Sequence, residues 1–451
     1  MVRSLRALAV FFTILASYGA FYALRALLGR KRTAKRLELV HERNARRLAE
    51  GCTRLRGVFI KLGQVLSVLG SFLPRAYGGA LERLQDRVPP RPFHEVEGRL
   101  REALGPDALA QFANLEREAI AAASLAQVHR GTTPDGRRVA VKVLYPGIEA
   151  LIRRDLAVLR FILPIAQRLL PIARLDRVLD QLSAMLARET DYAQERRNIE
   201  RIRRTLASHS AVVVPHVIDE LTAHSVLTMT FEDGIKITDF EAIDRAGIDR
   251  EAIARLLVEC YYAMLLEYRV FHADPHPGNF LVRPGPKLVI LDYGAVEEVT
   301  PELAQGMEQV VLGGISRNPD QVLKGLERMG FVAEGGDRAL LEKVGRDYLK
   351  TLATVRVEDF SNLDRDAVEK MTGFSQVRGR LREIMRHVEY PEGYFYIERT
   401  LVLLFGLVGQ LAPKAGLPGV AAPVAAKAML RSFAKAAEPT EAMDGAAKAP
   451  A

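Results

Sequence analysis

The stretch His272–Asn279 reads HADPHPGN, and it decides the fold class of this 451-residue chain. Asn279 follows Asp274 by five residues, which is the spacing that a catalytic loop requires. In such a loop the aspartate faces the acceptor, and the chain returns so that the asparagine holds a metal ion. The two histidines are four residues apart, but the prolines beside them exclude a metal-binding helix. The first histidine is therefore interpreted as structural, although Asp274 alone would also fit an ordinary loop cap.

A second stretch, Leu291–Gly294 (LDYG), places Asp292 eighteen residues after Asp274. A carboxylate that ends a strand before a glycine reaches Mg²⁺ bridging nucleotide phosphates, although an aspartate near a glycine is often only a turn. Between the two stretches, the residues at 284–286 (PGP) predict the turn of a hairpin. Loop, hairpin and aspartate in this order predict a kinase-like fold that takes ATP or ADP, with Mg²⁺ on Asn279 and Asp292.

The run Val139–Val143 (VAVKV) is β-branched and compact, and it predicts a buried strand. Lys142 in this run matches the strand lysine that pairs with nucleotide phosphates in kinases. A single lysine on a strand is more often a surface residue, but inside an apolar strand it needs a counter-charge. Glu195, on the predicted helical run Glu189–Glu195, is the best candidate for that partner. Lys142 and Glu195 are therefore predicted to act with Asp274 as the catalytic residues.

The loop expected to cover the phosphates is unusual, because a kinase normally carries a glycine-rich turn between its first two strands. The corresponding positions here hold three alanines and a serine: Ala121, Ala122, Ala123 and Ser124. Alanine Cβ atoms restrict positive φ values and keep phosphates farther from the backbone N–H groups. These residues are predicted to bind the nucleotide with a geometry that differs from that of an ordinary protein kinase.

Strand-like segments cluster between about residues 115 and 232 and helices follow, which indicates an α+β fold of two kinase-like lobes. The segment at 226–232 is interpreted as the strand into the hinge, where backbone groups near Met229 and Glu232 would bind adenine. The predicted organisation has five parts. These are a membrane anchor or interfacial helix (1–30), a helical extension (31–114), an N-lobe (115–232), a helical C-lobe (233–435) and a disordered tail (436–451).

The N-terminal run Ala7–Leu24 contains 18 residues without a charge, bracketed by Arg6 and Arg25, and it is long enough to cross a bilayer. Basic residues concentrate after the run, at 30–36, so the bulk of the chain is expected to face the cytoplasm. A cleaved signal peptide is an alternative, but no small-x-small cleavage site ends the run. An interfacial helix also stays open, because serine, glycine and two tyrosines dilute the apolarity. The sequence therefore predicts a membrane-associated protein.

Composition excludes some classes of site. The chain has two cysteines, Cys52 and Cys260, which cannot build a disulfide framework or a cysteine-based metal site. A net charge of +9 indicates either an anionic neighbour, such as lipid, nucleic acid or nucleotide, or a solvated arginine-rich surface. The solvated surface is favoured, and no nucleic-acid partner is expected, because basic and aromatic residues do not interleave as in RNA-binding motifs.

Taken together, these motifs resemble the UbiB/AarF-domain family of atypical kinases over roughly residues 35–415, with six motifs in the family's order. Further signatures support the resemblance. Lys61–Gln64 (KLGQ) is similar to the family's Lys-x-Gly-Gln motif on an N-terminal helical extension. Leu84–Pro90 (LQDRVPP) follows it as in the family, and Glu189–Asp191 (ETD) matches the Glu-x-Asp motif.

The resemblance implies that the extension lies over the active site as a regulatory cover. Lys61 would reach Glu189, Gln64 would join a network on the nucleotide side, and Asp191 belongs to the same regulatory set. Such a cover hinders protein substrates, so the resemblance implies ATPase or small-molecule phosphotransfer activity. The family link is to ubiquinone (isoprenoid quinone) biosynthesis or lipid homeostasis. The implied partners are nucleotide, a membrane lipid or lipophilic quinone precursor, and enzymes of quinone biosynthesis.

One departure and two alternatives accompany this prediction. Bacterial relatives in ubiquinone synthesis usually carry apolar spans at the C-terminus, whereas Leu401–Leu411 is too short to span and is expected to be a buried helix. A small-molecule kinase of the aminoglycoside or choline type shares the catalytic loop but lacks the alanine loop and the Lys-x-Gly-Gln helix. A nucleotide-gated scaffold without catalysis is the non-enzymatic alternative, although all the catalytic residues are present.

Overall fold

The chain forms two compact units in the computed structural model, which describes residues 2–68, 74–82, 89–169, 175–316, 318–331, 391, 393–413, 420 and 424. Unit 1 comprises Met1–Arg197 and His216–Phe231, and unit 2 comprises Asn198–Pro215 and Glu232–Ala451. The segment assigned to one lobe at 115–232 is thus shared between the units. The tail predicted at 436–451 lies outside the described residues.

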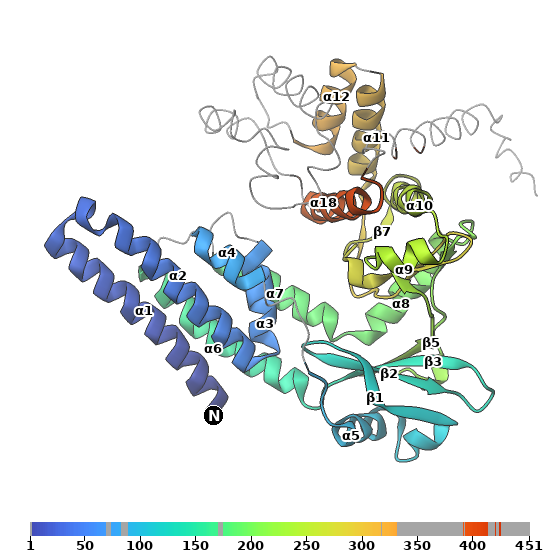
Figure 1. Cartoon of the computed structure of the whole chain (residues 1–451), viewed down its shortest axis with the longest axis horizontal. Coiled ribbons are helices and arrows are strands. Elements are labelled where there is room, and N and C mark those ends of the chain that lie inside the picture. Colours follow the sequence, from blue (N-terminus) through green and yellow to red (C-terminus); the bar gives the residue numbers. More distant parts are fainter. Residues whose placement is uncertain are drawn as a thin grey trace, which may run out of the picture. The chain divides into compact units, whose positions relative to one another are not determined.

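Unit 1 contains a four-stranded antiparallel sheet in the order β1-β2-β3-β5 (Figure 1). Its strands are β1 (Asn114–Ala122), β2 (Ala126–Thr132), β3 (Arg138–Leu144) and β5 (Val226–Thr230). β3 pairs with β2 on one side and with β5 on the other, so it is a central strand. Its β-branched residues suit that position, because they pack well on a pleated, buried surface.

The two faces of β3 have different tasks. Val139, Val141 and Val143 are buried in a hydrophobic core of unit 1, together with apolar side chains of α5 (Phe93–Leu104). Because successive side chains of a strand point to opposite faces, Lys142 is directed away from this core. The valines therefore fix the strand in the core while the lysine is presented on the other face of the sheet.

Helices form the rest of unit 1. They are α1 (Val2–Leu28), α2 (Arg30–Leu55), α3 (Val58–Val68), α4 (Arg75–Glu82), α6 (Ile148–Leu169), α7 (Leu175–Glu189) and the start of α8 (Tyr192–Thr205). The sequence predicts one helix over 31–69, but the structure has two. The cause is that Arg56 and Gly57 both adopt positive φ values, 54° and 55°, which end α2. α3 then packs against α4, α6 and α7.

α1 packs along α2 and α6 within unit 1 and buries one of its faces there. The Tyr18 hydroxyl is hydrogen-bonded to His41 Nδ1 (2.7 Å) and to the Tyr77 hydroxyl (2.9 Å). At the start of the helix, Arg3 Nη2 donates to Asp155 on α6 at 2.6 Å. These polar contacts show that α1 is an integral part of unit 1 in this structure.

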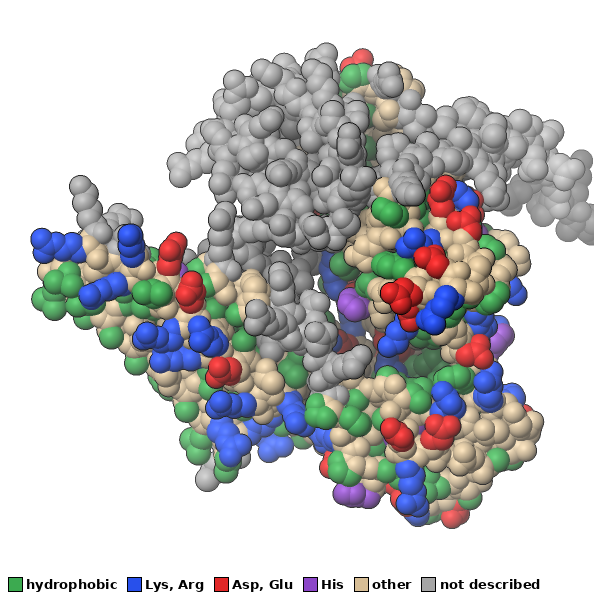
Figure 2. All heavy atoms as spheres, viewed as in Figure 1, with side chains coloured by type: hydrophobic (Ala, Val, Ile, Leu, Met, Phe, Trp, Pro, Cys, Tyr) green, Lys and Arg blue, Asp and Glu red, His purple; other side chains and the backbone are tan. Residues whose placement is uncertain are grey.

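The other face of α1 exposes large apolar side chains, including Leu5, Phe12 and Leu27. Figure 2 shows Lys and Arg side chains grouped over α1 and α2, next to exposed hydrophobic ones. Among the described residues, α1 is the single helix that is long and apolar enough to cross a membrane. Length and composition thus allow a span, but the charged helix α2 lies along α1 in this structure.

Unit 2 combines a small sheet, in the order β4-β9-β8-β6, with a ribbon of β7 and β10. The strands are β4 (Val212–Val213), β6 (Ile235–Lys236), β7 (Val270–His272), β8 (Phe280–Arg283), β9 (Lys287–Ile290) and β10 (Val296–Glu298). The helices are α9 (Phe240–Arg245), α10 (Arg250–Tyr262), α11 (Pro301–Ile315), α12 (Pro319–Met329) and α18 (Tyr394–Leu411). α10 packs against α18.

The hairpin predicted around residues 284–286 is present as β8 and β9, and Gly285 adopts the positive φ of 84° that its turn requires. The segment expected to be a buried helix at 401–411 belongs to α18, where Leu404, Leu407 and Val408 are buried. The sequence analysis did not predict β6, β7 or β10. Strands of two or three residues are too short to show an alternating pattern.

His129 gives unit 1 an expected pH dependence. It is buried on β2, where Nδ1 donates to the Glu116 carbonyl (2.8 Å) and Nε2 accepts from the Gln127 amide (2.9 Å). Burial lowers the pKa of His129 below its usual value, although the hydrogen bond to Glu116 acts in the opposite direction. The unfolded chain therefore binds this proton more readily, and stability should fall as the pH drops below about 6.5.

We expect the free energy of unfolding in urea to be lower near pH 5.5 than near pH 7.5. His129→Asn should make this difference smaller, because an amide does not titrate in this range. The measurement is a urea titration of both proteins at both pH values. A difference of the same size in the variant would show that His129 is not one of the groups responsible.

Candidate active site

Lys142 and Glu195 form a buried ion pair within unit 1. Lys142 Nζ lies 2.7 Å from Glu195 Oε1 and 2.9 Å from Oε2, so one ammonium group donates to both carboxylate oxygens. The Glu195 side chain is 1% exposed and that of Lys142 is 18% exposed. The Tyr192 ring lies 5.4 Å from Nζ, which is within range of a cation–π contact. The predicted contact is therefore present, and the Glu195 carboxylate is the more deeply buried of the two partners.

Asp191 sets the position of Glu195. Its Oδ1 accepts from Gln194 N at 2.9 Å, and its carbonyl accepts from Glu195 N at 3.0 Å, so it caps the first turn of α8. The sequence analysis placed Asp191 in the regulatory set. The structure adds a local task, because the cap fixes the turn from which Glu195 reaches Lys142.

Lys61 on α3 forms an ion pair with Glu189, the last residue of α7. The two side chains are 15% and 29% exposed, so this pair is partly shielded from solvent. The contact between the extension and the Glu-x-Asp motif is therefore present within unit 1. Gln64 also lies on α3, but its side chain is outside the described residues.

The alanine loop is a tight hairpin. Ala121 and Ala122 end β1, while Ala123 and Ser124 lie in the turn to β2. Ala123 N donates to the Ala126 carbonyl at 2.8 Å, and none of the four loop residues has a positive φ. Tyr145 directly follows β3, and its hydroxyl donates to the Ala123 carbonyl at 3.2 Å. The loop thus has the restricted backbone expected of residues that carry a Cβ atom.

The predicted hinge residues lie on either side of the division between the units. Met229 is buried on β5 of unit 1, and Glu232 is the first residue after the division. Within unit 2, Arg283 Nη2 donates to the Glu232 carboxylate at 2.8 Å, and its Nε donates to the Asp233 carbonyl at 2.7 Å. Backbone groups near Met229 and Glu232 are predicted to bind adenine. Arg283 holds the part of this segment that belongs to unit 2.

His272 connects the segment that carries Asp274 with the segment that carries Asp292 in unit 2. Its Nε2 donates to the Asp292 carbonyl at 2.6 Å, and its Nδ1 accepts from the Tyr261 hydroxyl at 3.0 Å. Burial lowers the pKa of His272, although the charge of Asp274 acts in the opposite direction. The neutral ring with its proton on Nε2 fits both partners. His272 is therefore a positioning residue, as the sequence analysis proposed.

Asp274 has two neighbours on different elements. Asn279 Nδ2 donates to the Asp274 carbonyl at 3.0 Å, which closes the catalytic loop. Arg399 on α18 donates to Asp274 Oδ1 at 2.8 Å, and the next residue, Thr400, donates to the Ala273 carbonyl at 3.1 Å. Two consecutive residues of α18 thus hold the loop, and the carboxylate of Asp274 stays partly exposed beside a cation.

Asn279 and Asp292 lie at neighbouring strand ends, because Leu291 N donates to the Asn279 carbonyl at 3.0 Å. The Asn279 amide nitrogen is engaged with the loop, so its oxygen is the atom suited to a cation. Asp292 Oδ1 accepts from Gly294 N at 2.9 Å. No group of three or more His, Cys, Asp or Glu in the described residues is arranged to hold a metal. This donor set fits Mg²⁺, which uses one or two carboxylates together with substrate phosphates.

Sequence reasoning missed Arg399 and Thr400, which lie about 125 residues after the loop that they hold. One signal was available: Glu398 and Arg399 are the only charged residues in the otherwise apolar α18. A charge in a helix of this composition needs a partner. Nothing in the sequence identifies Asp274 as that partner.

Comparison with known proteins identifies the family to which this chain is similar. Residues 83–326 match the family model described as the ABC1 atypical kinase-like domain. The protein ACTIVITY OF BC1 COMPLEX KINASE 8, chloroplastic, of Arabidopsis thaliana is 31% identical over 407 residues, covering 84% of this chain and 53% of that protein. AarF domain-containing protein kinase 1 of Xenopus tropicalis is 35% identical over 266 residues, covering 58% of this chain and 51% of that protein. The chain spans about half the length of these two relatives.

A solved structure supports the same fold. The Rv3197–erythromycin complex from Mycobacterium tuberculosis has a TM-score of 0.55 and 25% sequence identity, and the match covers 87% of this chain and 99% of that chain. The kinase-like α+β fold and the family resemblance predicted from the sequence are confirmed.

The contact between Arg399 and Asp274 leads to a test by substitution. If the chain releases phosphate from ATP, Arg399→Met should lower that rate about tenfold, because Asp274 loses the group that orients it. Arg399→Lys should restore part of the rate, and the affinity for Mg·ADP should change little. Arg255→Met, which removes a partly exposed and ion-paired arginine of α10, is the matched control. An unchanged rate in Arg399→Met would mean that α18 does not position the catalytic aspartate.

Proposed function

Because the chain belongs to the ABC1/AarF family of atypical kinase-like proteins, we propose that it binds ATP or ADP with Mg²⁺ and catalyses ATP hydrolysis or phosphoryl transfer to a non-protein acceptor. One observation carries this proposal: Lys142 on β3 donates to both oxygens of an almost fully buried glutamate on α8. In kinases a strand lysine paired with the glutamate of a nearby helix is the arrangement that serves the nucleotide phosphates.

Each residue has a proposed task. Lys142 holds the α- and β-phosphates, and Glu195 keeps it in place. Asn279 and Asp292 hold Mg²⁺, which supplies charge neutralisation at the phosphates when it is bound. Asp274 orients or deprotonates the acceptor, which is water or a hydroxyl group.

The restriction to a non-protein acceptor rests on the extension. Lys61 and Glu189 tie α3 to the end of α7, directly before the cap of α8. This contact supports a cover that is fixed by an ion pair rather than loosely attached. A long peptide needs an open groove, whereas water or a small hydroxyl compound does not.

We further propose that the protein works at a membrane and supports ubiquinone or lipid metabolism, with the kinase-like part on the cytoplasmic side. The exposed apolar side chains of α1, including Leu5, Phe12 and Leu27, support membrane contact. The packing of α1 on the charged helix α2 favours a helix that lies in the interface over one that spans the bilayer. A lipophilic substrate such as a quinone precursor is consistent with that placement.

Asp292→Asn tests the proposed activity. This isosteric change keeps the hydrogen-bond acceptor for Gly294 N but removes the charge that Mg²⁺ requires. Phosphate release from ATP by the purified chain should fall about 100-fold. Asp320→Asn, at an exposed position of α12, should leave the rate unchanged. In a strain that lacks the gene, the wild-type chain should restore quinone levels and Asp292→Asn should not.

The outcomes separate the alternatives. Equal phosphate release from wild type and Asp292→Asn would refute the enzymatic proposal. Nucleotide binding without any release above background would favour a nucleotide-gated scaffold. Normal quinone levels in the deletion strain would refute the proposed pathway while leaving the enzymatic activity intact.

A further inference from the structure

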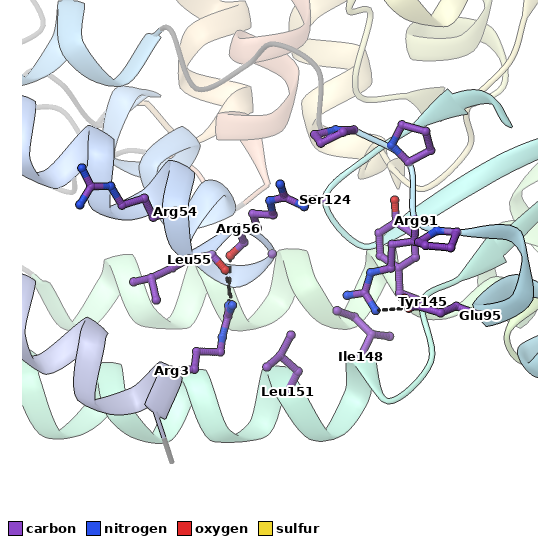
Figure 3. Close-up of a pocket in the computed structure, with 14 residues that line it drawn as sticks. Arg3, Arg54, Leu55, Arg56, Arg91, Glu95, Ser124, Tyr145, Ile148 and Leu151 are labelled. Atoms are coloured by element: carbon purple, nitrogen blue, oxygen red, sulfur yellow. Dashed lines mark hydrogen bonds and ion pairs between the residues drawn. The ribbon is translucent and has the colours of Figure 1, made fainter. Parts of the chain in front are cut away.

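Unit 1 contains a cavity whose lining includes Ser124 of the alanine loop and Arg56 at the end of α2. It has a volume of about 360 Å³ and lies between the end of α2, the segment Pro89–Pro92 and the first turn of α6 (Figure 3). This volume is within the range of small-molecule sites. Neither Lys142 nor Glu195 lines it. The cavity therefore shares Ser124 with the loop predicted to cover the nucleotide phosphates, but it does not include the ion pair.

Arginines dominate the charge of this cavity. Arg3, Arg54, Arg56 and Arg91 line it together with one acidic residue, Glu95. Arg3 is already engaged by Asp155 and by backbone carbonyls of α2. Arg91 Nη1 forms an ion pair with Glu95 Oε2 at 3.2 Å, and the Arg91 guanidinium carbon lies 4.2 Å from the centre of the Tyr145 ring. These two contacts hold the guanidinium plane in place. The lining thus has more positive than negative charge, as an anion site requires.

Arg56 is the least committed of these arginines. Its side chain is exposed and makes no hydrogen bond or ion pair with any residue that the structure describes. Its backbone has a φ of 54°, a conformation that disfavours residues with a Cβ atom and would suit glycine better. The arginine side chain at this position therefore stabilises neither the local backbone conformation nor an ion pair among the described residues. Figure 3 shows Arg56 on the α2 wall, across the cavity from Arg91.

Ser124 supplies an independent observation. The residue is 8% exposed and lines the cavity, and its hydroxyl is buried without a hydrogen-bond partner among the described residues. A buried hydroxyl without a partner is unfavourable, and a ligand oxygen in the cavity would remove that cost. The backbone beside it is held by the contact of Tyr145 with Ala123, so the serine is presented by a fixed loop.

We propose that this cavity binds a phosphate monoester. The guanidinium groups of Arg56 and Arg91 hold the phosphate, because their planar donors match its oxygens in pairs. The Ser124 hydroxyl donates to a third oxygen. The organic part of the ligand packs on the apolar lining, which includes Leu55, Ile148 and Leu151. Bare inorganic phosphate is the other source of the same chemistry, and the apolar lining favours the ester.

Equilibrium binding of inorganic phosphate and of n-butyl phosphate to the purified full chain tests the proposal. The wild type should bind both, and the ester more tightly, because only the ester contacts the apolar lining. Arg56→Gln and Arg91→Gln should each weaken binding of the ester about tenfold. Arg46→Gln removes an equal charge from an exposed position of the same helix α2 and should have no effect.

Two further variants keep the test independent of folding and of the nucleotide site. Ser124→Ala should weaken ester binding while the thermal unfolding temperature stays the same or rises, because the change removes an unsatisfied hydroxyl. The double substitution Lys142→Met, Glu195→Gln removes the nucleotide ion pair without leaving a buried charge, and ester binding should persist in it.

Tighter binding of inorganic phosphate than of the ester would keep the anion site and identify free phosphate as its ligand. Three results would overturn the proposal. The first is no binding of either probe by the wild type. The second is an equal loss in Arg46→Gln and Arg56→Gln, which would indicate a nonspecific charge effect. The third is loss of binding in the Lys142→Met, Glu195→Gln protein, which would place the anion in the nucleotide site.

Discussion

The ion pair between Lys142 and Glu195 is the interaction on which the rest of unit 1 depends. A carboxylate that is 1% exposed is tolerated only with a close cationic partner, and Lys142 supplies one at 2.7 Å. The valines of β3 fix the lysine by holding the strand in the core, and the Asp191 cap fixes the glutamate. An alternating strand and a capped helix therefore place the two partners of this ion pair.

In unit 2, the neutral ring of His272 holds the segments that carry Asp274 and Asp292. His272 is hydrogen-bonded to the Asp292 carbonyl on one side and to the Tyr261 hydroxyl on the other, so the imidazole ring links the segments around Asp274 and Asp292. α18 adds Arg399 and Thr400 to the same loop. The two aspartates therefore have different surroundings: Asp274 lies beside a cation, and Asp292 accepts a backbone N–H. These surroundings suit the proposed division between orienting an acceptor and holding a metal.

Local patterns in the sequence predicted most of this arrangement. The β-branched run around Lys142 and the PGP turn carry their structure in a few adjacent residues, and the spacing of Asp274, Asn279 and Asp292 indicates their common loop system. Contacts between distant segments were not predictable. The Arg399–Asp274 pair joins residues 125 positions apart, and the break of α2 at Arg56 depends on a φ value that its residue type disfavours. The placement of Ser124 in the cavity lined by Arg56 and Arg91 depends on how α2, α6 and the alanine loop pack together.

The central claim is that the Lys142–Glu195 pair of unit 1 holds the phosphates of a nucleotide. Calorimetric titration of Mg·ADP into the wild-type chain and into Glu195→Gln tests it most directly. The account predicts one site in the wild type, affinity about tenfold weaker in the variant, and no binding of Mg²⁺ without nucleotide. Equal affinity in both proteins, or tight binding of Mg²⁺ alone, would contradict it.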